Sequence, residues 1–207
     1  MRVKVLISSE MDENCYFVID ENTNEAIIID PGCEEYKINS VIEEEQLDIK
    51  AICLTHSHFD HAESAEAIRA NTNAPVLICQ GEEIVAESPS YNLSAMFGSP
   101  FTVPYDRVVA EGESFSFGSL EFEVIATPGH TPGGCCFYFE KEGVLFSGDT
   151  LFKTSVGRTD FPGGDTDALL DSIRNKLFLL PDDTIVYAGH GPKTEIGFEK
   201  KYNCINS

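Results

Sequence analysis

Apolar residues come in short runs along the first thirty positions, separated by polar and charged residues. The runs at residues 3–8, 15–19 and 26–30 have the length and composition of strands, and the last one ends at the turn Pro31-Gly32. This pattern is typical of strands that follow one another directly. We therefore predict that the chain opens with an antiparallel meander.

The spacing of the apolar residues then alternates between two periods. Within residues 38–42, and again within residues 62–68, apolar side chains recur at helical spacing. Short apolar runs at residues 51–54 and 75–78 indicate strands. We predict that the first half of the chain is partly β-α-β.

The second half repeats this style. Glycine-bearing turns separate its apolar runs, and one amphipathic stretch predicts a helix with Asp165 or Thr166 near its cap. The predicted strands are residues 114–117, 120–125, 136–139, 144–146 and 184–187, and the predicted helices are residues 169–177 and 195–202. Many strands with interspersed helices are typical of two sheets packed face to face with helices outside. Because the 207 residues contain no linker-like stretch and no repeat, we predict a single domain over residues 1–207.

The composition narrows the possible partners. Against 35 Asp and Glu stand only 14 Lys and Arg, and the resulting charge of −21 repels phosphate backbones, so we expect no nucleic-acid partner. The N-terminus has no apolar core of signal-peptide length, and no apolar run approaches a membrane span. The seven cysteines form an odd set without a C-x-x-C pair, which argues against a disulfide framework. We expect a cytoplasmic protein with reduced, mostly buried thiols, no membrane association and a small-molecule substrate.

Three of the five histidines lie in one short polar string. The string T-H-S-H-F-D-H contains His56, His58, Asp60 and His61, directly after a predicted strand and just before a predicted helix. A polar turn with capping residues would account for Asp60 but not for three histidines. Imidazole and carboxylate are ligands suited to zinc, iron or manganese, so the string predicts a metal site.

The other two histidines have equivalent surroundings. His130 in T-P-G-H-T-P-G-G and His190 in A-G-H-G-P both follow an apolar strand and lie in tight turns, where small neighbours let a ligand and the backbone approach closely. Five histidines at strand ends favour metal binding over the structural role of a lone histidine. In this company we interpret Asp149 in S-G-D as a carboxylate between two metals rather than a turn former. Asp30 in I-I-I-D-P-G either accepts a hydrogen bond from a ligand histidine or starts a turn.

Taken together, the strings H-x-H-x-D-H, G-H-T, S-G-D and G-H-G resemble the metallo-β-lactamase superfamily over nearly the whole chain. The resemblance implies an α/β (α+β) fold, a four-layer αβ/βα sandwich with the metals at one edge of the two sheets. We expect two divalent transition-metal ions, zinc in the first place, with iron or manganese as alternatives. The resemblance implies one metal on His56, His58 and His130, a second on Asp60, His61 and His190, and Asp149 between them.

Two further strings, G-R-T-D-F-P-G-G-D and G-H-G-P-K-T, are most similar to glyoxalase II-like (hydroxyacylglutathione) hydrolases, which cleave thioesters. The expected mechanism is attack of a metal-bridged hydroxide, oriented by Asp60, on the thioester carbonyl. Full-length glyoxalase II has a C-terminal helical domain that helps to hold glutathione, whereas this chain ends 207 − 190 = 17 residues after His190. We therefore expect weak affinity for glutathione conjugates. Arg158 and Lys193 are candidate cations for an anionic substrate group, and Arg158 could instead be clamped by Asp160 or Asp165.

Alternatives to thioester hydrolysis share part of this pattern. Persulfide dioxygenases are similar in the same strings but use one iron on two His and one Asp, a ligand set that suits oxygen activation. Retention of Asp60, His61 and His190 makes a second metal available and favours hydrolysis. A lactonase is a further alternative, because ring opening uses the same attack on a carbonyl. A metal-binding protein without catalysis would be expected to have a damaged ligand set.

Overall fold

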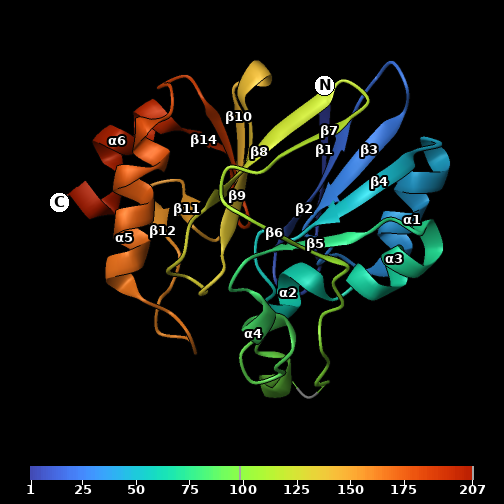
Figure 1. Ribbon diagram of the computed structural model, residues 1–207, viewed down its shortest axis with the longest axis horizontal. Helices are drawn as coiled ribbons and strands as arrows, with labels where there is room; N and C mark the ends of the chain where they lie inside the picture. Colours follow the sequence, from blue (N-terminus) through green and yellow to red (C-terminus); the bar gives the residue numbers. More distant parts are fainter. Residues whose placement is uncertain (98, 207) are drawn as a thin grey trace.

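The computed structural model describes residues 1–97 and 99–206, and its two six-stranded sheets lie between helices (Figure 1). The first sheet has the order β1-β2-β3-β4-β5-β6. Strands β1 to β3 pair antiparallel, and β3 to β6 pair parallel. The opening antiparallel meander is thus confirmed. The strands are β1 (Arg2–Ile7), β2 (Asn14–Ile19), β3 (Glu25–Ile29), β4 (Asp48–Cys53), β5 (Val76–Cys79) and β6 (Arg107–Val109).

The second sheet has the order β14-β13-β10-β9-β8-β7. Only β10 and β13 pair parallel within it. A small hairpin of β11 (Leu151–Phe152) and β12 (Ser155–Val156) follows β10. The strands of the sheet are β7 (Ser114–Phe117), β8 (Leu120–Ala126), β9 (Cys135–Phe139), β10 (Val144–Gly148), β13 (Ile185–Ala188) and β14 (Thr194–Glu195).

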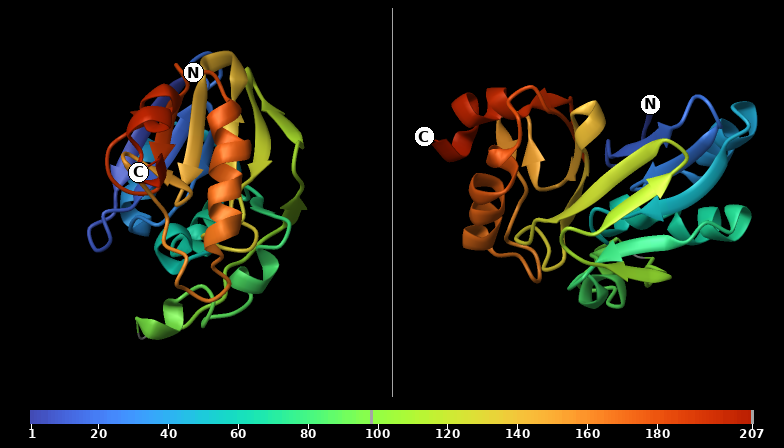
Figure 2. Two further views of the ribbon diagram at one scale, coloured as in Figure 1. Left: turned by 90° about the vertical axis from the view of Figure 1, so that its left-hand side faces the viewer. Right: turned by 45° about the horizontal axis from the view of Figure 1, so that its top comes forward.

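Helices cover the outer face of each sheet. In Figure 1, α1 and α3 lie beyond the first sheet and α5 and α6 beyond the second, and the side view in Figure 2 places α5 and α6 in front of their sheet. The α-helices are α1 (Glu35–Glu44), α2 (Phe59–Ala62), α3 (Ala65–Thr72), α4 (Glu83–Ala86), α5 (Thr166–Asn175) and α6 (Ile196–Tyr202). The 3-10 turns of the described residues are η1 (Ser94–Met96), η2 (Glu140–Glu142), η3 (Leu177–Leu179) and η4 (Cys204–Asn206).

Three apolar clusters fill the spaces between the four layers. Strand β2 sends Phe17 toward Ile38 of α1, and its neighbour Val18 toward Phe122 of the second sheet. A third cluster packs the far face of the second sheet against Leu169 of α5. Strands covered on both faces carry apolar residues at every position rather than at alternate ones, and β2 is buried along its full length. The four-layer αβ/βα sandwich is confirmed.

Several boundaries differ from the predicted ones for local reasons. The helix predicted over residues 62–68 is two helices, and the first begins at Phe59 inside the histidine string, so Asp60 and His61 lie on a helical turn. Helix α5 begins at Thr166 because the Asp165 carboxylate caps it by accepting a 3.0 Å hydrogen bond from the backbone nitrogen of Ala168. Strands β6 and β14 and helix α4 were not predicted, because two to four residues carry too little periodicity.

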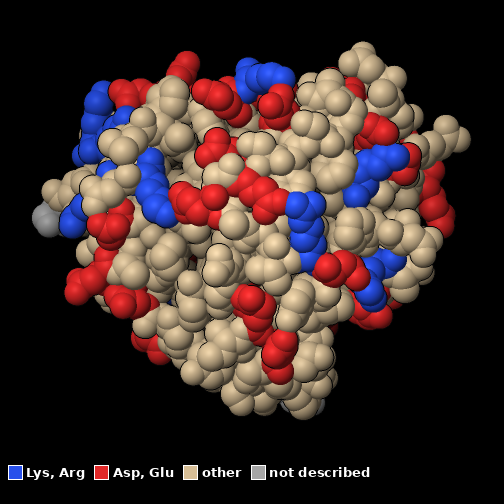
Figure 3. Space-filling model, in the orientation of Figure 1, with Lys and Arg blue, Asp and Glu red and all other residues tan. Residues whose placement is uncertain are grey.

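The surface is rich in acidic groups that alternate with basic ones. Figure 3 shows Lys and Arg side chains beside Asp and Glu side chains on the face seen in Figure 1. Arg69 and Asp106 form an ion pair at 2.7 Å. Six of the seven cysteine side chains are buried.

Within residues 1–97 and 99–206, none of the helices combines the length and the hydropathy that a membrane span requires.

Candidate metal centre

The strand directions bring all five histidines to one edge of the molecule. Strands β3 and β4 are parallel, so Asp30 after β3 and the histidine string after β4 leave the first sheet at the same end. Strands β10 and β13 are also parallel, and place Asp149 and His190 together. Strand β8 runs in the same direction as β10, since both are antiparallel to β9, and it is followed by His130. Loops after parallel strand ends converge at the sheet edge, where ligands bind in α/β proteins.

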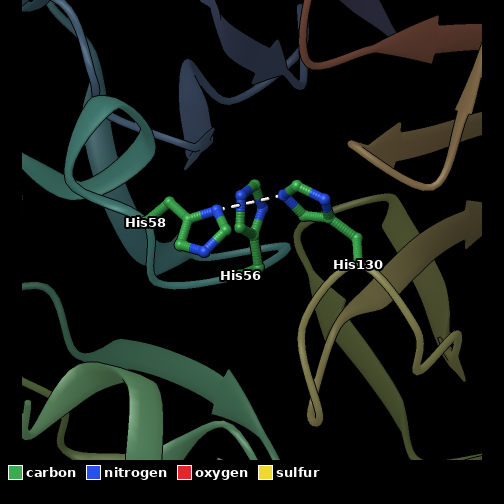
Figure 4. Close-up of side chains that lie close together, drawn as sticks. All are labelled: His56, His58 and His130. Atoms are coloured by element: carbon green, nitrogen blue, oxygen red, sulfur yellow. Dashed lines mark hydrogen bonds between the residues drawn. The ribbon is translucent and has the colours of Figure 1, made fainter. Parts of the chain in front are cut away.

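One group of donors consists of three buried imidazoles. Figure 4 shows His56 and His58, from the loop after β4, turned toward His130, from the loop between β8 and β9. The Nε2 atom of His130 lies 3.0 Å from Nδ1 of His58. One nitrogen of each ring lies within 4.8 Å of the other two. This spacing suits three ligands of one metal ion.

A second group lies beside the first. Its members are Asp60 and His61 of α2 and His190, whose ligand atoms also lie within 4.8 Å of one another. The Asp149 carboxylate lies between the two groups: its oxygens are 3.3 Å from Nε2 of His61, 3.6 Å from Nε2 of His130 and 3.8 Å from Nε2 of His190. The structure thus brings together all seven residues that the sequence predicts as ligands.

The atoms at the centre are those that a metal would be expected to bind. Nitrogen Nε2 of His56 and of His61, and oxygen Oδ1 of Asp149, are buried and have no hydrogen-bond partner within the described residues. These three residues offer ligand atoms within 4.8 Å of one another. Buried polar atoms in proteins are nearly always paired, so three unpaired ones so close together need a common partner. A divalent cation fits, because imidazole and carboxylate are its usual ligands.

The opposite ring nitrogens are held from outside the centre. Nδ1 of His61 lies 3.0 Å from Oδ2 of Asp30, and Nδ1 of His130 lies 2.7 Å from the backbone oxygen of Arg158. Asp30 is itself fixed, because it accepts hydrogen bonds of 2.7 and 2.6 Å from the backbone nitrogen and the hydroxyl of Thr55. The Thr55 hydroxyl also lies 3.2 Å from Nδ1 of His56. Contacts of this kind set the tautomer of a ligand imidazole and aim its free nitrogen at the metal.

Burial and neighbouring charges control the protonation of the centre. Burial, and after it the repulsion from the other imidazoles, lowers the pKa of His56. The same two effects lower the pKa of His58 to about 3. Both rings are therefore neutral and able to bind a cation. Burial alone would raise the pKa of Asp149, but the nearby His61, His130 and His190 together outweigh it and hold that pKa below its usual range. Against burial, the carboxylate of Asp149 raises the pKa of His61.

Two glycines allow the loops to approach this closely. Gly129, before His130, has φ +138°, and a Cβ atom there would lie 2.3 Å from the backbone nitrogen of Leu169. Gly148, before Asp149, has φ +48°, and a Cβ atom would lie 2.1 Å from the Thr55 hydroxyl. A side chain fits neither the space nor the backbone conformation. The glycines of the strings G-H-T and S-G-D are therefore part of how the ligands are placed.

A buried carboxylate that the sequence analysis missed joins the two loops of the three-histidine group. Glu82 accepts hydrogen bonds of 2.7 Å from the backbone nitrogen of Ser57, 2.8 Å from the Thr131 hydroxyl and 3.0 Å from the backbone nitrogen of Gly133. Ser57 lies between His56 and His58, and Thr131 follows His130. No local pattern marks Glu82, since its partners are 25 to 51 residues away in the chain.

The loop that carries His190 is held by two polar residues of β2, which were also missed. The Asn14 amide donates hydrogen bonds of 3.0 and 2.9 Å to the backbone oxygens of Ala188 and Gly191, and the Tyr16 hydroxyl donates one of 2.6 Å to Ala188. A polar residue at each of these positions in an otherwise apolar strand was the available signal. These bonds connect the first sheet to the end of β13.

A cavity of about 570 Å³ opens onto the centre. His58, Asp60, His130, Asp149 and His190 form its floor. Of the two cations predicted to hold substrate, Arg158 lines the cavity, where its guanidinium donates hydrogen bonds of 2.9 and 2.7 Å to Asp160. Lys193 lines a different hollow, with its ammonium 5.9 Å from the Tyr187 ring. The structure thus brings only one of the two cations to the metal centre.

Sequence comparison relates the chain to proteins with known names. The sequence model of the Metallo-beta-lactamase superfamily matches residues 9–190. The chain is 38% identical over 192 residues to the probable metallo-hydrolase YqgX of Bacillus subtilis, covering 92% of this chain and 90% of the relative. It is 36% identical over 206 residues to the hydroxyacylglutathione hydrolase GloC of Haemophilus influenzae, covering 98% and 97%.

Solved structures superpose on nearly the whole of this chain. The BLEG-1 B3 metallo-beta-lactamase superposes with a TM-score of 0.93 at 40% identity, covering 99% of each chain. TTHA1623, solved in a di-iron-bound form, superposes with a TM-score of 0.87 at 34% identity, covering 98% of this chain and 99% of the other. A protein of this fold and similar length therefore binds two iron ions.

Proposed function

The chain belongs to the metallo-beta-lactamase superfamily and is a metal-dependent hydrolase, and on this premise we propose that it cleaves thioesters with the help of two metal ions. One observation carries the proposal. Six ligand-type side chains form two adjacent groups with Asp149 between them, and five of these seven residues line a cavity, in a chain that is 36% identical to a hydroxyacylglutathione hydrolase over nearly its full length.

We assign the ligands according to these two groups. His56, His58 and His130 would hold one ion, Asp60, His61 and His190 the other, and Asp149 would contact both. The position of the Asp149 carboxylate, within 3.8 Å of an imidazole from each group, supports the bridging role. We propose divalent transition-metal ions, with zinc first; iron is supported as the alternative by the di-iron form of TTHA1623.

The residues of the centre supply position and charge for hydrolysis. The chemistry that two divalent cations held by these residues would supply is a water molecule whose pKa is lowered to about 7 and a polarised substrate carbonyl. The Asp60 carboxylate lines the cavity, and its pKa is held low, against burial, by the nearby His190 ring, so it can accept a hydrogen bond from the attacking water and orient it. The Asp149 carboxylate offsets positive charge at the buried centre.

The second ligand group distinguishes this proposal from its main alternative. A mononuclear oxygenase needs one iron on two His and one carboxylate, with open positions for oxygen. Here Asp60, His61 and His190 form a further complete group beside the three histidines. This arrangement favours a dinuclear hydrolase, and a lactonase would use the same attack on a carbonyl.

The test is a metal-resolved activity panel. The purified protein, loaded in turn with zinc, manganese and iron, is offered a thioester, a lactone and a persulfide, while thiol release, acid formation and oxygen uptake are recorded. We expect about two metal ions per chain and equal amounts of thiol and acid from the thioester, without oxygen consumption. His190→Ala should lose one ion and most turnover. Oxygen uptake with persulfide on a single iron would overturn the proposal.

A further inference from the structure

The walls of the cavity above the metal centre are apolar. Apart from the five ligand-type residues of its floor, every lining residue except Arg158 has an apolar side chain. These residues are Met11, Phe59, Leu93, Met96, Phe97, Phe152 and Phe161. A cavity of about 570 Å³ is large enough for a small organic group of drug-like size, which apolar and aromatic linings usually bind.

Apolar side chains reach the centre from both sides. The Phe161 ring lies 5.7 Å from the His58 ring, and the Phe152 ring lies 6.3 Å from the His190 ring, measured between centroids. Among the other lining residues, the Phe59 and Phe97 rings stack at 4.3 Å. A group bound at the metals would therefore have aromatic surface beside it.

Three of the wall residues are exposed. Met96, in the 3-10 turn η1, is 70% exposed, Phe97 after it is 58% exposed, and Met11 is 38% exposed. Exposed large apolar side chains at the rim of a cavity mark a surface that a ligand covers. Burying them against an apolar group removes their surface from water and would contribute binding free energy.

The cavity offers little to an anionic group. The Arg158 guanidinium is paired through two hydrogen bonds with Asp160 and lies 4.2 Å above the Phe161 ring. Its charge is thus largely compensated, and it forms part of the aromatic wall. A formal charge of −21 over the chain adds repulsion for a substrate with several carboxylates.

From these observations we infer that the substrate is a thioester with an apolar acyl group, alkyl or aryl, which lies between the Phe59–Phe97 pair and Phe161. The inference rests on the proposed thioester hydrolysis and names its substrate class. The metal centre holds the carbonyl, and the apolar walls hold the acyl group. Each methylene that the walls cover should raise kcat/KM about fourfold until the cavity is filled.

The experiment uses N-acetylcysteamine thioesters of acetyl, butyryl, hexanoyl and octanoyl groups with the metal-loaded protein. We expect kcat/KM to rise with chain length, and S-octanoylglutathione to be no better than the octanoyl N-acetylcysteamine ester. Phe97→Ser and Met96→Ser should reduce the octanoyl-to-acetyl ratio at least tenfold in combination. Leu179→Ser, an equally apolar and 76% exposed position in η3, is the matched control and should keep that ratio.

A binding arm separates this inference from the proposed function. S-alkyl-N-acetylcysteamine thioethers have no thioester carbonyl to attack, and their affinity is measured by calorimetry. If binding becomes tighter with each added methylene and this trend is lost in the Phe97 and Met96 variants, the cavity binds apolar groups as inferred. If at the same time no thioester is cleaved, the proposed thioester hydrolysis is wrong and the apolar binding site is not. Cleavage of thioesters with flat chain-length dependence in both arms, or a tenfold preference for the glutathione conjugate, would overturn the apolar acyl group.

Discussion

At the scale of single residues, the carboxylate of Asp149 is the point on which the dinuclear interpretation depends. It lies within 3.8 Å of His61 and His190 of one ligand group and of His130 of the other. An amide of the same volume would remove one negative charge between two cations and bind metals poorly. We expect Asp149→Asn to lower metal content below two ions per chain and turnover by at least about 100-fold, with an unchanged circular dichroism spectrum. Two retained metals and near-normal turnover would contradict the bridging role.

Asp30 is a carboxylate to compare with Asp149, because it contacts a ligand residue, His61, and is not itself assigned as a ligand. Its Oδ2 atom lies 3.0 Å from Nδ1 of His61, and it has no place in either ligand group. Substitutions of residues that orient a metal ligand typically cost 10- to 100-fold in affinity or activity. We expect Asp30→Asn to cost about that much and less than Asp149→Asn. Elemental analysis and turnover of both variants, measured side by side, decide the order.

At the scale of elements, Glu82 connects the loop after β4 to the loop between β8 and β9. Burial raises its pKa to about 7, against the lowering effect of its three hydrogen bonds. Gln at this position keeps the volume but turns an amide N–H toward at least one of the donors, and an unsatisfied buried group costs about 1–3 kcal/mol. We expect Glu82→Gln to lower the melting temperature by several degrees and to weaken metal binding by the three histidines.

A purely structural role for Glu82 would change stability alone, so the readout must include the metal. Cobalt(II) in place of the native ion gives a visible spectrum that reports ligand geometry. Glu44→Gln, at an exposed position of α1, is the control. If Glu82→Gln and the control give the same cobalt spectrum and metal affinity, Glu82 does not position the histidines.

The ion pairs between β1 and the C-terminal end of α1 predict that the stability of the protein depends on pH. Glu45, with Arg2 and Lys4 each at 2.5 Å, has a pKa lowered to about 2, chiefly by its hydrogen bond with Arg2. A folded pKa below the unfolded value of 4.5 means that the stabilisation is present above pH 4.5 and is lost as pH falls toward 2.

Because Glu45, Arg2 and Lys4 are all partly exposed, the effect of this contact on stability should be small. We expect Glu45→Gln to lower the free energy of unfolding at pH 7 by about 0.5–1 kcal/mol, and the difference from wild type to shrink as pH falls from 4.5 to 2. Urea unfolding of both proteins at several pH values measures it. A difference that is constant over this range would show that the pair is not what stabilises the contact.

At the scale of the whole molecule, the metals would connect the two sheets. Each assigned ligand group has two residues from the segment that follows β4 of the first sheet and one residue from a loop of the second sheet, His130 or His190. Each ion would therefore bind residues of both sheets. An ion at 100 times its Kd stabilises the folded state by about 2.7 kcal/mol, which is roughly 5–11 °C in melting temperature for a chain of this size. We expect a chelator to lower the melting temperature by this amount per ion, and added zinc to restore it. An unchanged melting curve after complete metal removal would contradict this linkage.

Local residue chemistry was sufficient for part of this picture. The histidine string, the turns at His130 and His190, and the capped start of α5 depend on neighbours within a few residues, so composition and spacing revealed them. Resemblance of the joined strings to a known superfamily supplied the layer order. Strands such as β2 were found because full burial leaves a continuous apolar run.

Other features depend on contacts that only the folded chain makes. Glu82 becomes a support of the centre because folding buries it completely and places it against Ser57 and Gly133, 25 and 51 residues away. The separation of Arg158 from Lys193, and the pairing of Arg158 with Asp160, likewise follow from the path of the loops. Residue identities thus determined which atoms could bind a metal, while the packing of two sheets decided which side chains surround them, because burial and distance are properties of the tertiary structure alone.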